Sequence, residues 1–519
     1  MLEAACNGRG TCGKCRVRLL QAKTPVTDDE RRFLSAEETG QGYRLACRVQ
    51  IYGDMKVQVP DSGYAQIQVP DSGDMQKQAP DDGSARMQVP DSSDTCKQEP
   101  DGGQNSLRES TEYCIAADLG STTLAAVLLD ASGKSVAQAF SVNSQRAYGA
   151  DVISRIQASN EGKQKQLQEC ICRDMEQLFG TLFKALDGSG RVTRIAIAAN
   201  TVMLHLLRGY SCEKLGQAPF EPVSLELESL DYAQLFAGPA PLLGCRVYLL
   251  PGMSAFLGAD ITAGLYSSGF WQMPEGETAF FADLGTNGEL VYGSRDGFVS
   301  ASAPAGPAFE GGSLSCGMPG MPGAVSNVSY LYHRVRVQTV GQKKPCGICG
   351  TGALEAVSAL LKEGLLNAEG LLAPELSASG MLLAKREDGT AIRLTQADIR
   401  EIQMAKAAVR AGIEILQRKY REISGRPVSE GPQRVYLAGG FGYYLSAQTA
   451  AAIGLFPPEW TDRVISCGNT SLKGAAAFLT DPACAGELER IRARGRNIWL
   501  ENEPDFPDIY VQNMRFSDM

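Results

Sequence analysis

The heptapeptide Ala-Asp-Leu-Gly-Thr-Asn-Gly at residues 282–288 and an earlier heptapeptide, Ala-Asp-Leu-Gly-Ser-Thr-Thr at residues 117–123, decide how this chain folds. Each follows a short apolar run and precedes another, so each is predicted to be a tight turn between two strands. Both begin with the same four residues. The sequence therefore predicts two similar lobes.

The composition of these turns suits an anion. Glycines let the backbone approach closely, Ser and Thr offer hydroxyls and N–H groups, and Asp can hold a hydrated Mg²⁺. A single turn of this kind usually only reverses the chain, but two copies favour phosphate binding.

Length and charge limit the classes of function. The 519 residues are enough for about three domains with proper cores. The chain is 44% hydrophobic and 21% charged, without an apolar run of about 20 residues, so neither a membrane span nor a secretory signal is expected. The net charge of −9 disfavours nucleic-acid binding, and only two histidines are present, which excludes histidine-rich metal sites. Fifteen cysteines favour thiols and metal ligands in a reducing cytoplasm.

Four cysteines near the N-terminus have the spacing of a cluster-binding loop. Cys6, Cys12 and Cys15 lie on a Gly-rich segment with five and two residues between them, and Cys47 follows 32 positions later. Four thiolates of this kind predict an iron–sulfur cluster. Zinc sites usually use two Cys-x2-Cys pairs, whereas here there is only one, so a zinc site is the weaker alternative.

The cysteine loop resembles ferredoxins of the plant and adrenodoxin type, which implies a β-grasp domain with a [2Fe–2S] cluster. Such domains normally start with a hairpin and a helix before the loop. Only five residues precede Cys6, so we expect either a start that is placed too late or a truncated domain.

A repeat of ten residues follows this domain. Pro-Asp pairs recur at a fixed interval, beginning at Pro60, Pro70, Pro80, Pro90 and Pro100. The segment has turn-forming residues and almost no core residues, so we expect a solvated tether. A repeat expansion with no role beyond spacing is an equal alternative.

From residue 113 the chain alternates predicted strands and helices. Residues 164–186 have apolar side chains at steps of three and four, which predicts an amphipathic helix with Cys170 in the core. Asn200 and Thr201 either face a ligand or cap a helix, and His205 is expected to be structural. Cys346 and Cys349 form an isolated pair for which a redox or metal role is the minor alternative.

The last glycine motif is Val-Tyr-Leu-Ala-Gly-Gly at residues 435–440, a predicted buried strand that ends in a double-glycine turn. Two phosphate turns followed by such a strand resemble the superfamily of acetate kinases, sugar kinases, heat-shock ATPases and actin. The resemblance implies an α/β fold with a two-lobed actin-like ATPase core.

The ferredoxin loop, the tether and this core together resemble the reductive activators of corrinoid proteins. Further similar stretches are residues 148–155, 200–203, 258–261 and 506–516. The implied domains are a ferredoxin-like domain at 1–57, a linker at 58–112, and the first and second lobes at 113–270 and 271–519.

The family resemblance implies an ATP-dependent one-electron reductase that returns the Co(II) corrinoid of a methyltransferase system to Co(I). Asp118 and Asp283 would position Mg²⁺ or water. The phosphates would be held by Gly120, Ser121, Thr122, Thr123, Gly285, Thr286, Asn287 and Gly288. The adenosine would lie on Gly439 and Gly440, and the cluster would be bound by Cys6, Cys12, Cys15 and Cys47.

The same resemblance implies a corrinoid protein as partner, a low-potential electron donor such as a ferredoxin, and a possible homodimer. Three alternatives stay open. An activator of the 2-hydroxyacyl-CoA dehydratase type would lack the ferredoxin loop, a small-molecule kinase would form a phosphorylated product, and a redox-sensing regulatory ATPase would bind ATP without turnover.

Overall fold

The computed structural model describes residues 16–19, 26–45, 57–58, 66–68, 111–186, 190–238, 242–331, 334–425 and 431–517. The predicted cluster ligands Cys6, Cys12, Cys15 and Cys47 lie outside these residues, as does most of the predicted linker. Within the linker range the structure describes one short strand, residues 66–68, which pairs with residues 138–140, and the ends of the two flanking strands. No described helix has the length and apolar character needed to cross a membrane.

The N-terminal elements form a small antiparallel sheet of strand order β2-β1-β3 with short helices beside it. Its elements are β1 (Arg16–Leu19), α1 (Asp28–Arg31), α2 (Ala36–Gly40), β2 (Tyr43–Leu45) and β3 (Val57–Gln58). The carboxylate of Glu30, only 1% exposed, accepts a hydrogen bond from the Leu45 N–H at 2.9 Å. This buried contact ties α1 to the end of β2, two residues before Cys47.

The first lobe is built on a seven-stranded sheet of order β4-β7-β6-β5-β8-β10-β9. Strands β5, β6 and β7 are antiparallel neighbours, and β8 and β10 run parallel to β5 on its other side. The strands are β4 (Gln66–Gln68), β5 (Thr111–Leu119), β6 (Thr123–Asp130), β7 (Ser135–Val142), β8 (Gly190–Ala199), β9 (Glu228–Asp231) and β10 (Arg246–Leu249).

The second lobe repeats this order in a six-stranded sheet, β20-β19-β11-β12-β13-β21. Strands β11, β12 and β13 are antiparallel neighbours, and β19 and β20 lie parallel beside β11. The prediction of two similar lobes is confirmed. The strands are β11 (Ala279–Leu284), β12 (Gly288–Ser294), β13 (Gly297–Ala303), β19 (Arg434–Ala438), β20 (Val464–Gly468) and β21 (Gly495–Asn497).

Helices cover the outer face of each sheet. In the first lobe α4 packs on β6 and β7, and it confirms the amphipathic helix predicted from the apolar spacing; Cys170 on it is 3% exposed. The helices of this lobe are α3 (Val152–Ala158), α4 (Gln164–Phe183) and α5 (Thr201–Arg208).

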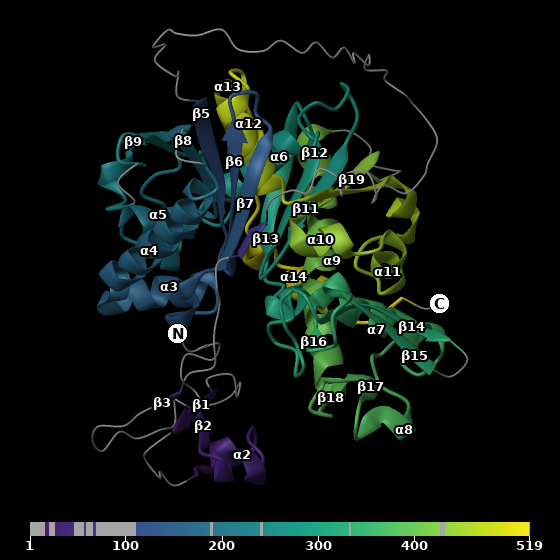
Figure 1. The fold of residues 1–519 in the computed structure, drawn as a ribbon. Helices are drawn as coiled ribbons and strands as arrows, with labels where there is room; N and C mark the ends of the chain where they lie inside the picture. Colours follow the sequence, from purple (N-terminus) through teal and green to yellow (C-terminus); the bar gives the residue numbers. More distant parts are fainter. Residues whose placement is uncertain are drawn as a thin grey trace, which may run out of the picture.

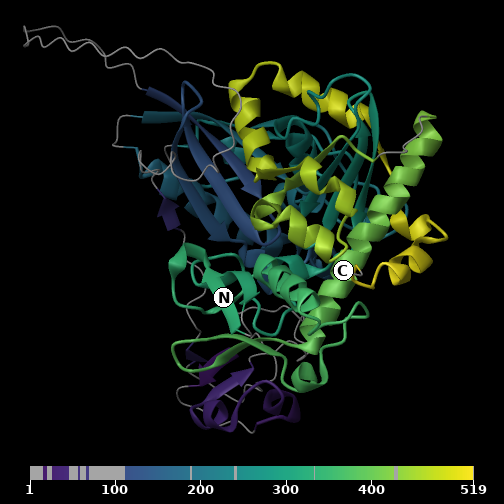
Figure 2. The same cartoon turned by 90° about the vertical axis from the view of Figure 1, so that its right-hand side faces the viewer.

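In the second lobe the long helix α9 (Gln396–Ser424) packs on β12 and β13. Figure 2 shows α9 as the long light-green helix beside the sheet. The other helices of this part are α10 (Gly439–Tyr444), α11 (Ala447–Ala452), α13 (Cys484–Arg494) and α14 (Phe506–Gln512).

A small subdomain extends from the second lobe, at the lower right of Figure 1. Its helix α7 packs on β14, and α9 leads from it back to the second sheet. The elements are β14 (Ala324–Leu331), β15 (Arg334–Thr339), β16 (Gly347–Ile348), α7 (Gly350–Lys362), α8 (Pro374–Ser377), β17 (Met381–Lys385) and β18 (Ala391–Leu394).

Two helices, α6 (Ala259–Ser267) and α12 (Thr470–Thr480), lie between the two sheets (Figure 1). They pack closely on each other, and α12 also contacts β5 and β8 of the first lobe. A hydrophobic cluster that includes Ala116 of β5 and Phe281 of β11 surrounds them. The lobes therefore share a buried core, and their relative position depends on the fit between α6 and α12.

A methyl group at the contact between these helices should separate them. A Cβ on Gly474 would lie 2.4 Å from the Ala263 carbonyl oxygen, so Gly474→Ala should lower the free energy of unfolding by about 1–3 kcal/mol. The matched control is Gly486→Ala on α13, where a Cβ meets nothing within 4 Å and stability should rise by about 0.4–1 kcal/mol. Urea unfolding measures both, and a Gly474→Ala protein as stable as the wild type would contradict this packing.

Candidate functional site

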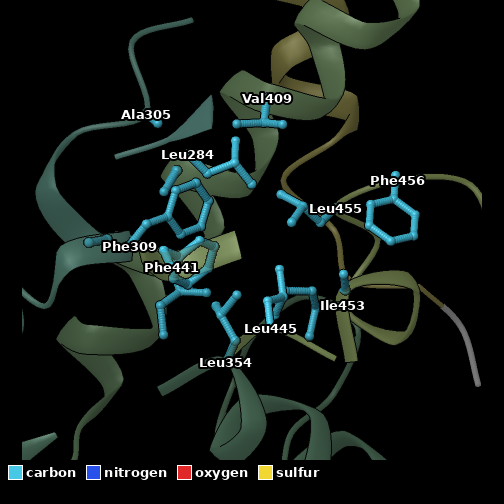
Figure 3. Packing of buried hydrophobic residues seen from close by; sticks show 14 of the residues in the cluster. Leu284, Ala305, Phe309, Leu354, Val409, Phe441, Leu445, Ile453, Leu455 and Phe456 are labelled. Atoms are coloured by element: carbon cyan, nitrogen blue, oxygen red, sulfur yellow. The ribbon is translucent and has the colours of Figure 1, made fainter. Parts of the chain in front are cut away.

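The two glycine turns occupy equivalent positions in the two lobes. The first connects β5 to β6 and the second connects β11 to β12, which confirms both predicted strand–turn–strand units. The second turn is supported from beneath by α9, because a Cβ on Gly288 would lie 3.0 Å from Cγ2 of Val409. Figure 3 shows Val409 near Leu284, the last residue of β11.

One carboxylate joins the two turns. Glu310 lies at the end of the short helix η8 (Pro307–Glu310), and its Oε2 accepts hydrogen bonds from the hydroxyls of Thr122 at 2.8 Å and Thr286 at 3.0 Å. Its Oε1 lies against Gly285, where a Cβ would be 3.0 Å away. Sequence analysis missed Glu310, since nothing in the pattern of a Gly-rich segment links it to Thr122, 188 positions earlier.

Asp118, predicted as a site residue, lies at the end of β5 and contacts the start of α12. Its two carboxylate oxygens accept hydrogen bonds from the Asn469 side-chain amide and the Ser471 hydroxyl, both at 2.8 Å. Asn469 also caps α12 by accepting the Leu472 N–H. The sequence patterns did not identify these partners, which lie 351 and 353 positions after Asp118.

Asp283, the second predicted acid, lies beside the glycine pair. Gly439 directly follows β19, the parallel neighbour of β11, and a Cβ on it would lie 2.5 Å from Oδ1 of Asp283. Its φ of +79° also favours glycine. Gly439 begins α10 with Gly440 next to it, so a helix start replaces the expected double-glycine turn.

Five acidic side chains from both lobes meet around these turns. Loss of solvation, followed by the charges of neighbouring acids, raises the pKa of Asp283 to about 7 and that of Asp260 on α6 to about 8. The same causes raise the pKa of Glu289 well above its usual range. The pKa of Asp118 is raised by burial against the opposing effect of its hydrogen bonds to Ser471 and Asn469.

These carboxylates suit a cation that binds together with phosphates. In the described part of the chain no three His, Cys, Asp or Glu side chains form a metal-binding group by themselves. Mg²⁺ usually takes one or two carboxylates and completes its shell with water and substrate phosphates, which fits this arrangement. A cation here would also relieve the repulsion that raises these pKa values.

A buried arginine holds the first turn. Arg155 on α3 is fully buried, and its guanidinium donates to the carbonyl oxygens of Ser121 at 2.5 Å and Gly149 at 3.1 Å. Burial lowers its pKa to about 10, so it stays charged at neutral pH. The Asn143 amide donates to the Gly120 carbonyl at 2.9 Å. The backbone of the turn is thus fixed from within the first lobe.

The remaining polar motifs have structural contacts. Asn200 caps α5 by accepting the Val202 N–H at 2.9 Å, which favours the capping interpretation. His205 is confirmed as structural, since Nδ1 donates to the Thr201 carbonyl and Nε2 accepts the Val223 N–H, both at 2.8 Å.

The isolated cysteine pair is split between solvent and core. Cys346 is exposed and Cys349 is buried, and both are free thiols. The Cys349 thiol donates to the Val325 carbonyl oxygen at 3.3 Å. Among the described residues no group of three metal-ligating side chains includes this pair, so nothing there favours a metal role for it.

A cavity of about 290 Å³ opens beside the second turn, between the lobes. Val152 and Phe256 of the first lobe face Trp499 and Phe506 of the second, and Asn287 lies at its edge. The predicted turn residue Asn287 therefore borders an apolar space shared by both lobes.

Three family models match consecutive parts of the chain. A 2Fe-2S iron-sulfur cluster binding domain matches residues 2–52, the RACo middle region matches residues 113–273, and the C-terminal domain of RACo, the ASKHA domain, matches residues 277–519. The three matches follow the order of the predicted domains.

Two curated relatives match most of the chain. The corrinoid activation enzyme RamQ of Eubacterium limosum is 31% identical over 436 residues, 79% of this chain and 71% of that protein. The [Co(II) methylated amine-specific corrinoid protein] reductase of Methanosarcina barkeri is 26% identical over 78% of this chain and 77% of its own length.

A solved structure has the same architecture over nearly the whole chain. The reductive activator for corrinoid, iron-sulfur protein superposes with a TM-score of 0.71 at 25% identity, covering 99% of this chain and 93% of that chain.

The acids predict an unusual pH dependence of stability in the absence of Mg²⁺ and nucleotide. Because the folded pKa values of Asp283 and Asp260 are above the ordinary 3.8, their contribution to stability is complete below about pH 4 and is lost as the pH rises through 7 to 8. The melting temperature in EDTA should therefore fall between about pH 4 and pH 8 and level off above that range. Mg²⁺ should raise it more at the higher pH.

Differential scanning fluorimetry of wild type, Asp283→Asn and the exposed control Asp388→Asn measures this dependence. Asp283→Asn should have a shallower fall than the wild type, because one of the acids with a raised pKa is gone. The control should follow the wild type. An equally steep fall in Asp283→Asn would show that Asp283 does not carry the effect.

Proposed function

The chain belongs to the family of reductive activators of corrinoid proteins, and from this premise we propose how its cleft and its cysteines serve the reaction. It is an iron–sulfur reductase that passes one electron from a [2Fe–2S] cluster to the Co(II) corrinoid of a methyltransferase system and restores Co(I). The names and coverage of the relatives favour this activity over a small-molecule kinase or a purely regulatory ATPase.

We propose Cys6, Cys12, Cys15 and Cys47 as the ligands of the cluster. The match of residues 2–52 to a 2Fe-2S domain supports this set, and four thiolates suit a [2Fe–2S] centre. When bound, such a centre supplies one electron at a potential near about −400 mV. The Glu30–Leu45 hydrogen bond supports the strand that leads to Cys47.

We further propose that ATP and Mg²⁺ bind between the lobes. Gly120, Ser121, Thr122 and Thr123 would hold phosphates from one side, and Gly285, Thr286, Asn287 and Gly288 from the other. Asp118 and Asp283 would position Mg²⁺ or water, and Gly439 and Gly440 would face the adenosine. The observation that carries this proposal is the meeting of both turns on one carboxylate, beside acids that raise one another's pKa.

A nucleotide bound to both turns would stabilise one arrangement of the lobes. If the corrinoid partner binds that arrangement more tightly, nucleotide binding and partner binding are thermodynamically coupled. A coupling free energy of about 1.4 kcal/mol changes the affinity for the partner tenfold. For a one-electron step, a tenfold change in the equilibrium constant corresponds to a shift of about 59 mV in reduction potential. Modest differential binding in the complex can therefore assist the reduction of Co(II).

The proposed reaction also requires an electron donor and a suitable compartment. We propose a low-potential electron donor such as a ferredoxin, a cytoplasmic location and a possible homodimer. The ten described cysteines are all free thiols, which supports a reducing compartment. The net charge of −9 argues against a nucleic-acid partner.

Loss of one proposed cysteine ligand should prevent assembly of the [2Fe–2S] cluster. After anaerobic reconstitution with iron and sulfide, wild-type protein should give the EPR signal of a reduced two-iron cluster, and Cys47→Ser should lose most of it. Cys346→Ser, an exposed free thiol, is the matched control. A full signal in Cys47→Ser would contradict the proposed ligand set.

Loss of a proposed cleft acid should affect the nucleotide-dependent step alone. Asp118→Asn should leave the cluster signal intact and lower the rate of ATP-dependent Co(I) formation, followed by visible absorption with a corrinoid partner, at least about tenfold. Asp462→Asn, an exposed acid on η10 (Pro458–Arg463), is the control. An unchanged ATP-dependent rate in Asp118→Asn would exclude the proposed role of this carboxylate.

A further inference from the structure

Glu310 binds the two hydroxyls that a nucleotide phosphate would need. Thr122 comes from the first lobe and Thr286 from the second, yet both donate to the same oxygen of one carboxylate. Bonds from neutral donors to an ionised acceptor are among the stronger hydrogen bonds in proteins. The two lobes are therefore linked here by a single side chain.

We propose that Glu310 is an interlobe clasp that takes the place of a phosphate group, and that nucleotide phosphates displace it by competing for Thr122 and Thr286. This inference rests on the proposed nucleotide site, and it adds a means by which that site controls the lobes. The competing species are both anions and both hydrogen-bond acceptors. One cannot use the two hydroxyls while the other occupies them.

The surroundings of Glu310 are suited to an anion. The positive charge of the buried Arg155 interacts favourably with Glu310 across the first turn. Gly285 leaves room for the carboxylate, since a Cβ there would come within 3.0 Å of Oε1. Asp283, whose pKa is raised in part by Glu310, shows that a further negative charge at this position is costly. Phosphates would thus enter more readily once Glu310 has moved.

Movement of Glu310 would also affect elements that contact the helix η8 outside the two turns. The preceding residue of η8, Phe309, stacks on Phe441 of α10 with ring centroids 4.8 Å apart and an angle of 23° between the planes (Figure 3). The first residue of α7, Gly350, is so close to the Phe309 carbonyl oxygen that a Cβ would lie 1.8 Å from it. The helix η8 therefore connects the clasp to the predicted adenosine side and to the small subdomain.

Hydrogen exchange of the nucleotide-free protein tests the clasp itself. In Glu310→Ala the backbone amides of residues 119–123 and of residues 284–288 should both exchange faster than in the wild type, because the common contact is lost. The matched control is Glu355→Gln, a partly buried glutamate on α7 that accepts a hydrogen bond at 2.9 Å from Thr449 of α11 rather than from either turn. Unchanged exchange at both turns would overturn the clasp.

Titration calorimetry with ADP in EDTA tests the competition. Removal of the competing carboxylate should tighten ADP binding by about tenfold or more in Glu310→Ala, the order expected for a hydrogen bond to a charged group. Glu289→Gln, which changes a neighbouring carboxyl group without touching the two hydroxyls, should have a smaller effect. Weaker or unchanged ADP binding in Glu310→Ala, or a gain no larger than that of Glu289→Gln, would overturn the competition.

Two further comparisons keep the outcomes separate. Glu310→Gln retains the shape of the side chain and one acceptor oxygen, so it replaces Glu310→Ala in both experiments if the alanine variant is unstable. Its changes in amide exchange and in ADP affinity should have the same directions as those of Glu310→Ala and be smaller. If wild-type protein binds no ADP, the proposed nucleotide site and the competition fail together. The exchange experiment still decides whether Glu310 links the lobes.

Discussion

Negative charge at the junction of the two lobes is the constraint on which the rest of the structure depends. Asp118, Asp260, Asp283, Glu289 and Glu310 come from separate strands and helices, and the pKa values of Asp283 and Asp260 are raised to about 7 and 8. Such a group is tolerated only if donors, protons or a cation offset it. The scaffold supplies donors from Asn469, Ser471, Thr122 and Thr286, and the raised pKa values of Asp283 and Asp260 show that these donors offset the charge only in part.

The duplicated lobes explain how these groups are brought together. Each sheet carries its acid at the end of the strand that leads into its glycine turn, Asp118 on β5 and Asp283 on β11. The helices α6 and α12 are packed between the sheets at glycine contacts and set the spacing of the lobes. A change in that spacing alters the separation of Thr122 and Thr286, so the chemistry of the cleft and the arrangement of the lobes depend on each other.

The two glycine turns, the two similar lobes and the family could be predicted from the sequence because short, local residue patterns indicate each of them. Gly439 is an example, since a glycine after a buried strand signals close approach, and Asp283 is the group that approaches it. Glu310, Asn469 and Ser471 could not be predicted, because their first-lobe partners Thr122 and Asp118 lie 188 to 353 positions away and no local periodicity marks them. The four proposed cluster ligands lie outside the described residues, so their assignment stays a prediction.

A crystal structure of the protein with Mg²⁺ and a non-hydrolysable ATP analogue tests the central claim most directly. We expect phosphates between residues 120–123 and 285–288, with Mg²⁺ or its water near Asp118 and Asp283 and the adenosine beside Gly439. A nucleotide bound elsewhere, with both turns unchanged, would contradict it.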